Sequence, residues 1–131
     1  IRDLTAWGER LVFTAADDFG LEPWISDGTA SGTRRLADLA PGPQSSYPVL
    51  IPGKSLLYID AVTGGSPPVG LFVTDGSHSS PRLLGRFTST TYGAVISPVA
   101  LGDRLFFSAY TRAAVRPWTS DGTPEGTYAL S

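Results

Sequence analysis

The 131-residue chain lacks cysteine and methionine, and it contains a single histidine and a single lysine. Without cysteine it forms no disulfide, offers no thiolate nucleophile and lacks the commonest zinc ligand. The one histidine, His78, does not make a metal centre, so we predict neither a metal nor a cofactor. The chain also has no apolar run near the roughly 18 residues that cross a membrane as a helix. We therefore predict no membrane span.

No charge of one sign dominates the sequence. Its 10 basic residues stand against 12 acidic ones, for a net charge of -2, and provide no basic field for nucleic acid. We expect no nucleic-acid partner. With neither a starting methionine nor a basic-then-apolar leader, the sequence indicates a processed or excised segment. Its hydrophobic content of 41% suffices for the core of one ordinary domain.

What the sequence does contain is a repeated phrase. "EPWISDGTASGT" at 22–33 returns as "RPWTSDGTPEGT" at 116–127, and a weaker copy, "GLFVTDGSHSSP", lies at 70–81. A second anchor keeps a similar spacing, because a glycine precedes an apolar run in every unit. These glycines are Gly8, Gly53 and Gly102. Two anchors in one register indicate a repeat of about 45 residues, and such a period decides the fold class.

Each unit divides into four short extended stretches. In the middle unit these are 47–51, 55–61, 70–75 and 81–87, rich in Val, Ile, Leu, Phe and Tyr and separated by Gly, Pro, Ser or Asp. Near-continuous apolar runs such as "RLVF", "SLLYI" and "RLFF" predict strands covered on both faces. No segment keeps a helical apolar period. Four strands per repeat of this length are typical of a β-propeller blade.

We therefore predict an all-β fold of three four-stranded antiparallel propeller blades. Their boundaries are 1–45, 46–94 and 95–131, and the fourth strand of the last blade, 127–131, is truncated. Closed propellers have about 4–8 blades, so three blades leave two apolar faces open, and such faces are association sites. We expect two copies to close a six-bladed ring, of which one chain is half; the alternative is further blades from a parent protein.

The DGT phrase has a structural explanation. Asp-Gly after a strand favours a tight turn, because Gly accepts a positive φ and the Asp side chain accepts backbone N–H bonds. Thr29 and Thr123 can add hydroxyl bonds to the same corner. The aromatic residue three positions earlier lies on the third strand, where a large ring can wedge between neighbouring sheets. The repeat residues predicted to be structural are Trp24, Asp27, Gly28, Thr29, Phe72, Asp75, Gly76, Trp118, Asp121, Gly122 and Thr123.

These residues resemble the bacterial ELWxxDGT repeat family, and the resemblance covers essentially the whole chain. Residues 20–42, "GLEPWISDGTASGTRRLADLAPG", fit the family pattern, with Pro23 in place of its usual Leu. The main departures are Gly70, Phe72 and Ser77 in the middle copy and Arg116 in the third. The resemblance implies a repeat-built, propeller-like protein, secreted or on the cell surface of a bacterium. It implies no catalysis, because the family motif carries none that is known.

The residues give little support to an enzyme. His78 lies in the polar turn "DGSHSS", a poor place for a preorganised base. The paired carboxylates of a propeller glycosidase have to reach the central funnel, and the innermost strands offer only Asp3. Asp17 and Asp18 do not match a calcium loop, although they can still join a calcium site. The insertion at 64–70, "GGSPPVG", matches no phosphate-binding motif. We predict no catalytic residue.

A recognition surface remains. In a propeller, the loops between second and third strands share one face with the connectors between blades. Tyr and Arg are enriched at binding hot spots, and aromatic rings also stack on sugars. The candidate ligand-binding residues on this face are Asp17, Asp18, Phe19, Tyr47, Tyr92, Tyr110 and Arg112. Trp7 has no counterpart in the other units, and we expect it either to be exposed at the opposite face or to fill a blade junction.

Two functions follow from these observations. The leading hypothesis is a non-enzymatic structural or interaction module, a propeller segment that associates with itself or with another protein at a bacterial surface or outside the cell. The alternative is a lectin-like carbohydrate-binding propeller with clefts between blades. A multivalent sugar site repeats its polar residues, yet Glu22, Gly70 and Arg116 share one position and differ in charge. This difference disfavours the lectin interpretation.

Overall fold

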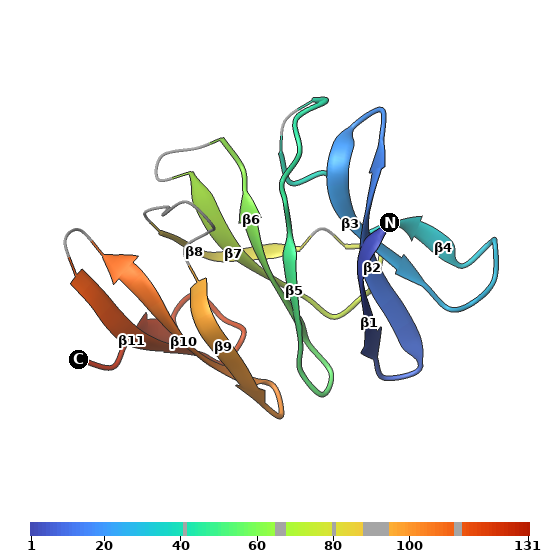
Figure 1. Cartoon of the computed structure of the whole chain (residues 1–131). Coiled ribbons are helices and arrows are strands. Elements are labelled where there is room, and N and C mark those ends of the chain that lie inside the picture. Colours follow the sequence, from blue (N-terminus) through green and yellow to red (C-terminus); the bar gives the residue numbers. More distant parts are fainter. Residues whose placement is uncertain (41, 65–67, 80, 88–94, 112–113) are drawn as a thin grey trace.

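The chain is all-β in a computed structural model that describes residues 1–40, 42–64, 68–79, 81–87, 95–111 and 114–131. Twelve strands form three four-stranded antiparallel sheets, which lie side by side in chain order (Figure 1). The predicted all-β architecture of three such sheets is confirmed. The described residues do not form a closed ring of sheets, and they include no helix long and apolar enough to cross a membrane.

Each sheet is a simple meander whose neighbouring strands are consecutive in the chain. Sheet 1 contains β1 (Arg2–Trp7), β2 (Arg10–Asp17), β3 (Gly20–Ser26) and β4 (Thr33–Arg35). Sheet 2 contains β5 (Val49–Pro52), β6 (Leu57–Val62), β7 (Val69–Thr74) and β8 (Arg82–Phe87). Sheet 3 contains β9 (Val95–Leu101), β10 (Arg104–Thr111), β11 (Ala114–Ser120) and β12 (Thr127–Ala129). Val69 and Gly70, the last two residues of the insertion predicted at 64–70, belong to β7, and residues 65–67 of that insertion lie outside the described residues.

The strand register gives each sheet two distinct faces, since successive side chains point to opposite sides. Trp24 pairs with Phe13 in sheet 1, and Trp118 pairs with Phe107 in sheet 3. In sheet 2, Phe72 takes the place of the Trp. We call the face that carries these aromatic residues the front face of a sheet and the opposite one its back face.

The sheets stack front to back around two apolar clusters. The front face of sheet 2 packs on the back face of sheet 1, and the front face of sheet 3 packs on the back face of sheet 2. The first cluster joins Trp7, Val12, Ile25 and Leu36 to Leu57, Ile59, Ala61 and Phe72. The second joins Tyr58, Leu71, Val73, Leu84 and Phe87 to Leu105, Phe107, Ala109 and Trp118. Among the described residues, sheet 2 alone has another sheet on each face. The prediction of strands covered by sheets on both faces is therefore wrong for "RLVF" and "RLFF", which lie in the two outer sheets.

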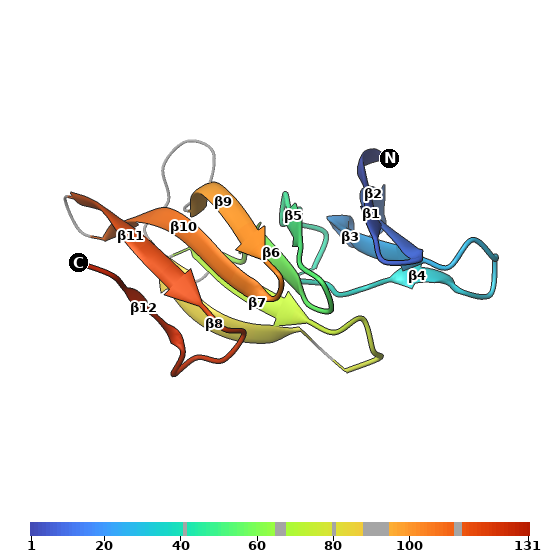
Figure 2. The same ribbon diagram turned by 90° about the horizontal axis from the view of Figure 1, so that it is seen from below.

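The first strands of the three sheets gather along one edge of the molecule. The view from below places β1, β5 and β9 on one side and the fourth strands β4, β8 and β12 on the other (Figure 2). Strand β5 contacts both β1 and β9. The three sheets thus spread outward from a shared line of first strands.

Candidate functional site

The two complete DGT phrases fold into the same hydrogen-bonded corner. In sheet 1, the Asp27 carboxylate accepts from the Thr29 N–H at 2.9 Å and from the Thr29 hydroxyl at 2.7 Å. The Thr29 oxygen in turn accepts from the Gly32 N–H at 2.9 Å, and the Thr33 hydroxyl donates to the Thr29 carbonyl at 2.6 Å. The corner satisfies its own polar groups, as predicted for a structural turn. Sheet 3 repeats each bond at Asp121, Thr123, Gly126 and Thr127.

In its described residues, the middle corner keeps part of this network. The Ser77 N–H donates to the Asp75 carboxylate at 2.9 Å, and the Gly76 N–H donates to the Thr74 hydroxyl at 3.0 Å. Hydrogen bonds from the neighbouring hydroxyl residue keep the pKa values of all three aspartates below their ordinary value. These carboxylates are therefore ionised and engaged in turns, which gives them no role as proton donors near neutral pH.

The repeat aromatics differ in what they touch. The Trp118 indole packs edge-on against Phe87 of sheet 2, with ring centroids 5.1 Å apart, and Phe72 belongs to the cluster between sheets 1 and 2. Both wedge between sheets as predicted. Trp24 does not: it stacks on Phe13 of its own sheet at 6.4 Å, on a front face that no described sheet covers.

Trp7 fills the junction between sheets 1 and 2, one of the two places expected for it. Its side chain is only 1% exposed and lies in the first cluster. The Arg10 guanidinium sits over the indole ring at 4.1 Å from its centroid, within the range of a cation–π contact.

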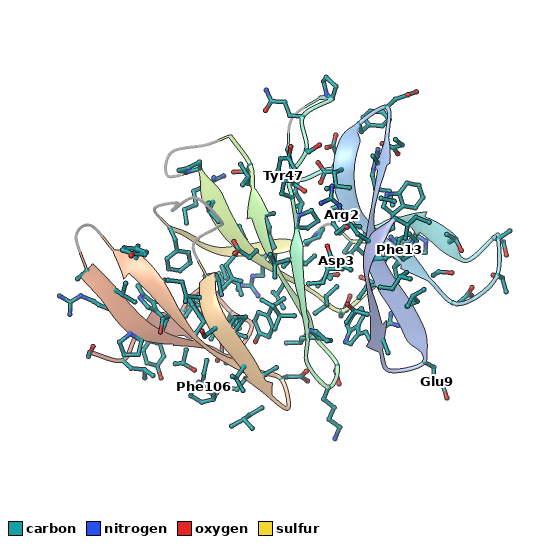
Figure 3. All side chains as sticks on the ribbon, in the orientation of Figure 1. Arg2, Asp3, Glu9, Phe13, Tyr47 and Phe106 are labelled. Carbon is teal, nitrogen blue, oxygen red and sulfur yellow. The ribbon has the colours of Figure 1, made fainter. Side chains whose placement is uncertain are left out.

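Among the described residues predicted to form a recognition surface, Asp17 and Phe19 come together at the β2–β3 turn. Asp17 pairs with Arg35 at 3.3 Å, and the same guanidinium lies over the Phe19 ring at 4.1 Å. Phe19 and Tyr47 are exposed, and Tyr47 lies at the same end of the molecule as the β2–β3 turn (Figure 3). Asp18 is exposed and Tyr110 is half-buried. Tyr92 and Arg112 lie outside the described residues.

The residues that the structure describes contain no group that could hold a metal ion. No three His, Asp or Glu side chains in those ranges lie close enough together to hold a metal ion. His78 is exposed in the corner of sheet 2. Asp3, on the innermost strand of sheet 1, is exposed, and the Thr14 hydroxyl lies 3.3 Å from its carboxylate. Its φ of 60°, like the 50° of Ser97 at the matching place in β9, marks a strained bulge.

One polar site was missed at the level of the sequence. The Glu22 carboxylate is fully buried and accepts from the N–H groups of Leu39 (2.9 Å) and Ala40 (3.2 Å) and from the Ser46 hydroxyl (2.6 Å). Burial raises its pKa, and the three hydrogen bonds oppose that rise. Glu22 therefore holds the connector between sheets 1 and 2, residues 36–48, against sheet 1; we call these three hydrogen bonds the Glu22 clasp. The only sequence signal was its position in the repeat, where Gly70 and Arg116 stand in the other units.

A second polar contact lies between sheets 2 and 3. The Asp103 carboxylate, in the β9–β10 turn, accepts from the N–H groups of Ser55 and Leu56 in the β5–β6 turn, and the Tyr58 hydroxyl donates to the Asp103 carbonyl at 2.6 Å. Desolvation acts to raise the pKa of Asp103, but the amide bonds outweigh it and the pKa stays below its ordinary value. This carboxylate thus has a structural role.

The two outer faces differ from the inner ones in exposure. At one front-face position, Leu57 and Leu105 are 0% exposed while Leu11 of sheet 1 is 37% exposed. At one back-face position, Leu36 and Leu84 are 7% and 6% exposed while Leu130 of sheet 3 is 52% exposed. The back face of sheet 3 also exposes Val99, Leu101, Val115 and Tyr128 and holds a shallow hollow beside Phe106 and Pro117. The front face of sheet 1 and the back face of sheet 3 are the candidate functional surfaces.

No protein-family model matches the chain, and no curated protein is significantly similar to it. The resemblance to the repeat family consequently rests on the repeat residues themselves.

Proposed function

We propose that the chain is a non-enzymatic structural and interaction module, a three-bladed segment of a β-propeller that acts by associating through its two open faces. Each sheet is one blade of this propeller, and the shared edge of first strands is its axis. Six blades from two chains complete the ring, and blades from another part of a parent protein are the alternative source. On the family resemblance, we propose that this module lies on the surface of a bacterium or outside the cell.

One observation supports association most strongly. The same leucine positions that are buried between sheets inside the chain are exposed at its two outer faces, at 37% for Leu11 and 52% for Leu130. Because each of these leucines is covered by a neighbouring sheet in two repeats out of three, the exposed copy in the third repeat indicates a surface that can contact another sheet of the same kind. Contiguous apolar surface of this kind is typical of protein contact sites.

The lectin-like alternative receives less support. Its clefts need aromatic rings open to a sugar, yet the Trp118 ring is packed against Phe87 and Phe107. The indole nitrogens of Trp24 and Trp118 are both buried, without a hydrogen-bond partner among the described residues. An enzymatic role also receives little support, because its two candidate residues lie in different sheets: Asp3 is exposed on β1 and His78 is exposed in the corner of sheet 2.

The test is the solution mass across a range of protein concentrations. A species of twice 13.8 kDa is expected. Leu130→Asp and Leu11→Asp, at opposite faces, should each reduce it to a folded monomer, because each puts a charge into an apolar contact. Phe19→Asp is the control and should leave the mass of the dimer unchanged. Phe19 is 46% exposed, but it lies at the β2–β3 turn, away from the β1–β2 turn next to Leu11. A wild-type chain that stays monomeric and folded at every concentration would contradict the proposal.

A further inference from the structure

The contact between sheets 2 and 3 contains a polar lock besides its apolar cluster. The Asp103 carboxylate accepts hydrogen bonds from the backbone N–H groups of Ser55 (2.6 Å) and Leu56 (2.8 Å). The Lys54 N–H donates to the Gly102 carbonyl at 2.9 Å. These hydrogen bonds join the first turn of sheet 3 to the first turn of sheet 2. They therefore fix the position of sheet 3 relative to sheet 2.

The first turn of sheet 1 has the same form as that of sheet 3. Residues 8–10 read Gly-Glu-Arg and residues 102–104 read Gly-Asp-Arg, and the two glycines have φ values of 61° and 59°. Glu9 therefore stands where Asp103 stands. Its side chain is exposed at the tip of the β1–β2 turn, directed away from the rest of the chain (Figure 3).

The contact between sheets 1 and 2 contains a second lock, formed from the back face. The Arg34 guanidinium, on β4, donates to the carbonyls of Gly76 (2.8 Å) and Ser77 (3.1 Å) in the corner of sheet 2. In sheet 3 the matching position on β12 is Tyr128, by the strand register, and this side chain is 49% exposed. Its hydroxyl can donate to a corner carbonyl as the guanidinium does.

We propose that the partner of both open faces is a second copy of this chain, docked so that the front face of sheet 1 covers the back face of sheet 3 of the other copy. The inference rests on the proposed function and adds the partner and the seating. Glu9 of one copy lies against the first turn of sheet 3 of the other, beside the partner's Arg104. Tyr128 reaches the DGT corner of sheet 1 of the other copy. A two-fold axis repeats both contacts.

Complementarity between the two faces selects a second copy over an unrelated protein. One chain carries an uncovered front and an uncovered back, the two halves of the contact that it already forms twice within itself. The charges also match across the new contact, because Glu9 is acidic and Arg104 is an exposed base. Inside the chain, Arg10 matches Arg104 and its guanidinium helps to lower the pKa of Asp75 in the corner of sheet 2. In the new contact, the residue of sheet 1 that matches Asp75 is Asp27.

Charge reversal tests the seating. Glu9→Arg and Arg104→Glu, each alone, are expected to raise the dimer dissociation constant at least about tenfold at low salt, and the double variant should restore it to within about threefold. Glu125→Arg makes the same charge change on the exposed corner of sheet 3 and should leave the constant unchanged. Thermal unfolding by circular dichroism verifies that every variant is folded.

Cross-linking provides a second measurement that does not depend on those variants keeping their affinity. Because the chain contains no cysteine, Glu9→Cys and Arg104→Cys introduce single thiols. A short bis-maleimide should join a mixture of the two into a dimer, and neither variant alone, since the two-fold axis keeps equal positions apart. A mixture of Glu9→Cys with Glu125→Cys is the matched control and should remain uncoupled.

The outcomes separate the two proposals. A wild-type chain that is monomeric throughout overturns both the proposed function and this inference. A dimer that ignores the single charge reversals, is not rescued by the double variant and gives no cross-link between positions 9 and 104 overturns the seating and leaves the proposed function standing. Rescue together with the mixed cross-link supports the docking of sheet 1 on sheet 3.

Discussion

Sheet 2 carries the weakest copy of the repeat and has the best-packed strands, while sheets 1 and 3 carry the complete corners and are each open on one side. Five side chains of sheet 2, on both of its faces, are 0% exposed: Leu57, Tyr58, Ile59, Val69 and Leu71. At the positions of the two corner threonines of the other sheets, its corner has Ser77 and Pro81. Because neighbouring sheets cover both faces of sheet 2, apolar packing contributes most of its stability, and its corner hydrogen bonds contribute less.

The outer sheets show the reverse balance. Sheet 1 adds to its corner the buried Glu22 clasp, and sheet 3 adds the Asp103 lock. A sheet covered on one side gains less from apolar burial, so polar contacts form a larger share of what holds it. We therefore expect the corner hydrogen bonds to contribute more to the stability of sheets 1 and 3 than to that of sheet 2.

The largest expected effect contrasts equivalent leucines. Leu57→Ala should lower the free energy of unfolding by about 3 kcal/mol, because it leaves a cavity between two sheets. Leu11→Ala at the matching place in sheet 1 should cost about 1 kcal/mol in the monomer, since Leu11 is already 37% exposed. Chemical denaturation at low protein concentration measures both. Equal losses of unfolding free energy at Leu57 and Leu11 would contradict the predicted difference between the inner and the outer sheet.

A smaller effect is expected at the connector. Glu22→Ala leaves the N–H groups of Leu39 and Ala40 and the Ser46 hydroxyl without their acceptor, and we expect a loss of about 2 kcal/mol. Arg116→Ala, at the same repeat position in sheet 3, is the control and should change stability by less than about 0.5 kcal/mol, because this side chain is exposed. Amide hydrogen exchange at Leu39 and Ala40 should rise in the Glu22 variant alone.

The smallest effect is expected at the corners. Thr29→Val removes both the bond to Asp27 and the bond from Gly32 and should lower the melting temperature by about 3 °C. Ser77→Ala, in the weaker corner, should change it less. A larger shift for the serine variant would contradict the division between packing and corner bonds.

The same corners predict an acid dependence. The pKa values of Asp27 and Asp121 are lower in the folded chain than in the unfolded one, so the unfolded chain binds more protons. Their contribution is present above the ordinary carboxyl range and is lost as the pH falls through the lowered values. The Thr29→Val variant should unfold with a shallower dependence on acid, which thermal melts over an acidic pH series can measure.

Much of the fold was predictable because the same strand and turn signals occur in each of the three units. The Asp-Gly turn, the aromatic residue three positions earlier and the glycine before each apolar run fixed the strand order of every sheet. The different surroundings of Trp24 and Trp118 were not predictable from their identical motifs, because the difference depends on which sheet follows or precedes them in space.

The polar contacts were harder to anticipate for a physical reason. Glu22 and Asp103 act on backbone groups of segments that are distant in sequence, and no spacing rule reveals a side chain whose partner is a main-chain N–H elsewhere. Their signal in the sequence is a change of residue type at a repeated position. Glu22 shows such a change clearly, because Gly70 and Arg116 stand at its position in the other units. From the sequence alone, that difference is evidence only against a repeated sugar site.

Ser46 joins sheets 1 and 2 through three of its own polar groups. Its N–H donates to Leu21 of sheet 1 at 2.9 Å, its hydroxyl donates to Glu22 at 2.6 Å, and its carbonyl accepts from Val62 of sheet 2 at 2.8 Å. A force that pulls the first two sheets apart has to break these bonds together with the Trp7 contact. Sheets 1 and 2 should therefore bear mechanical load as one body.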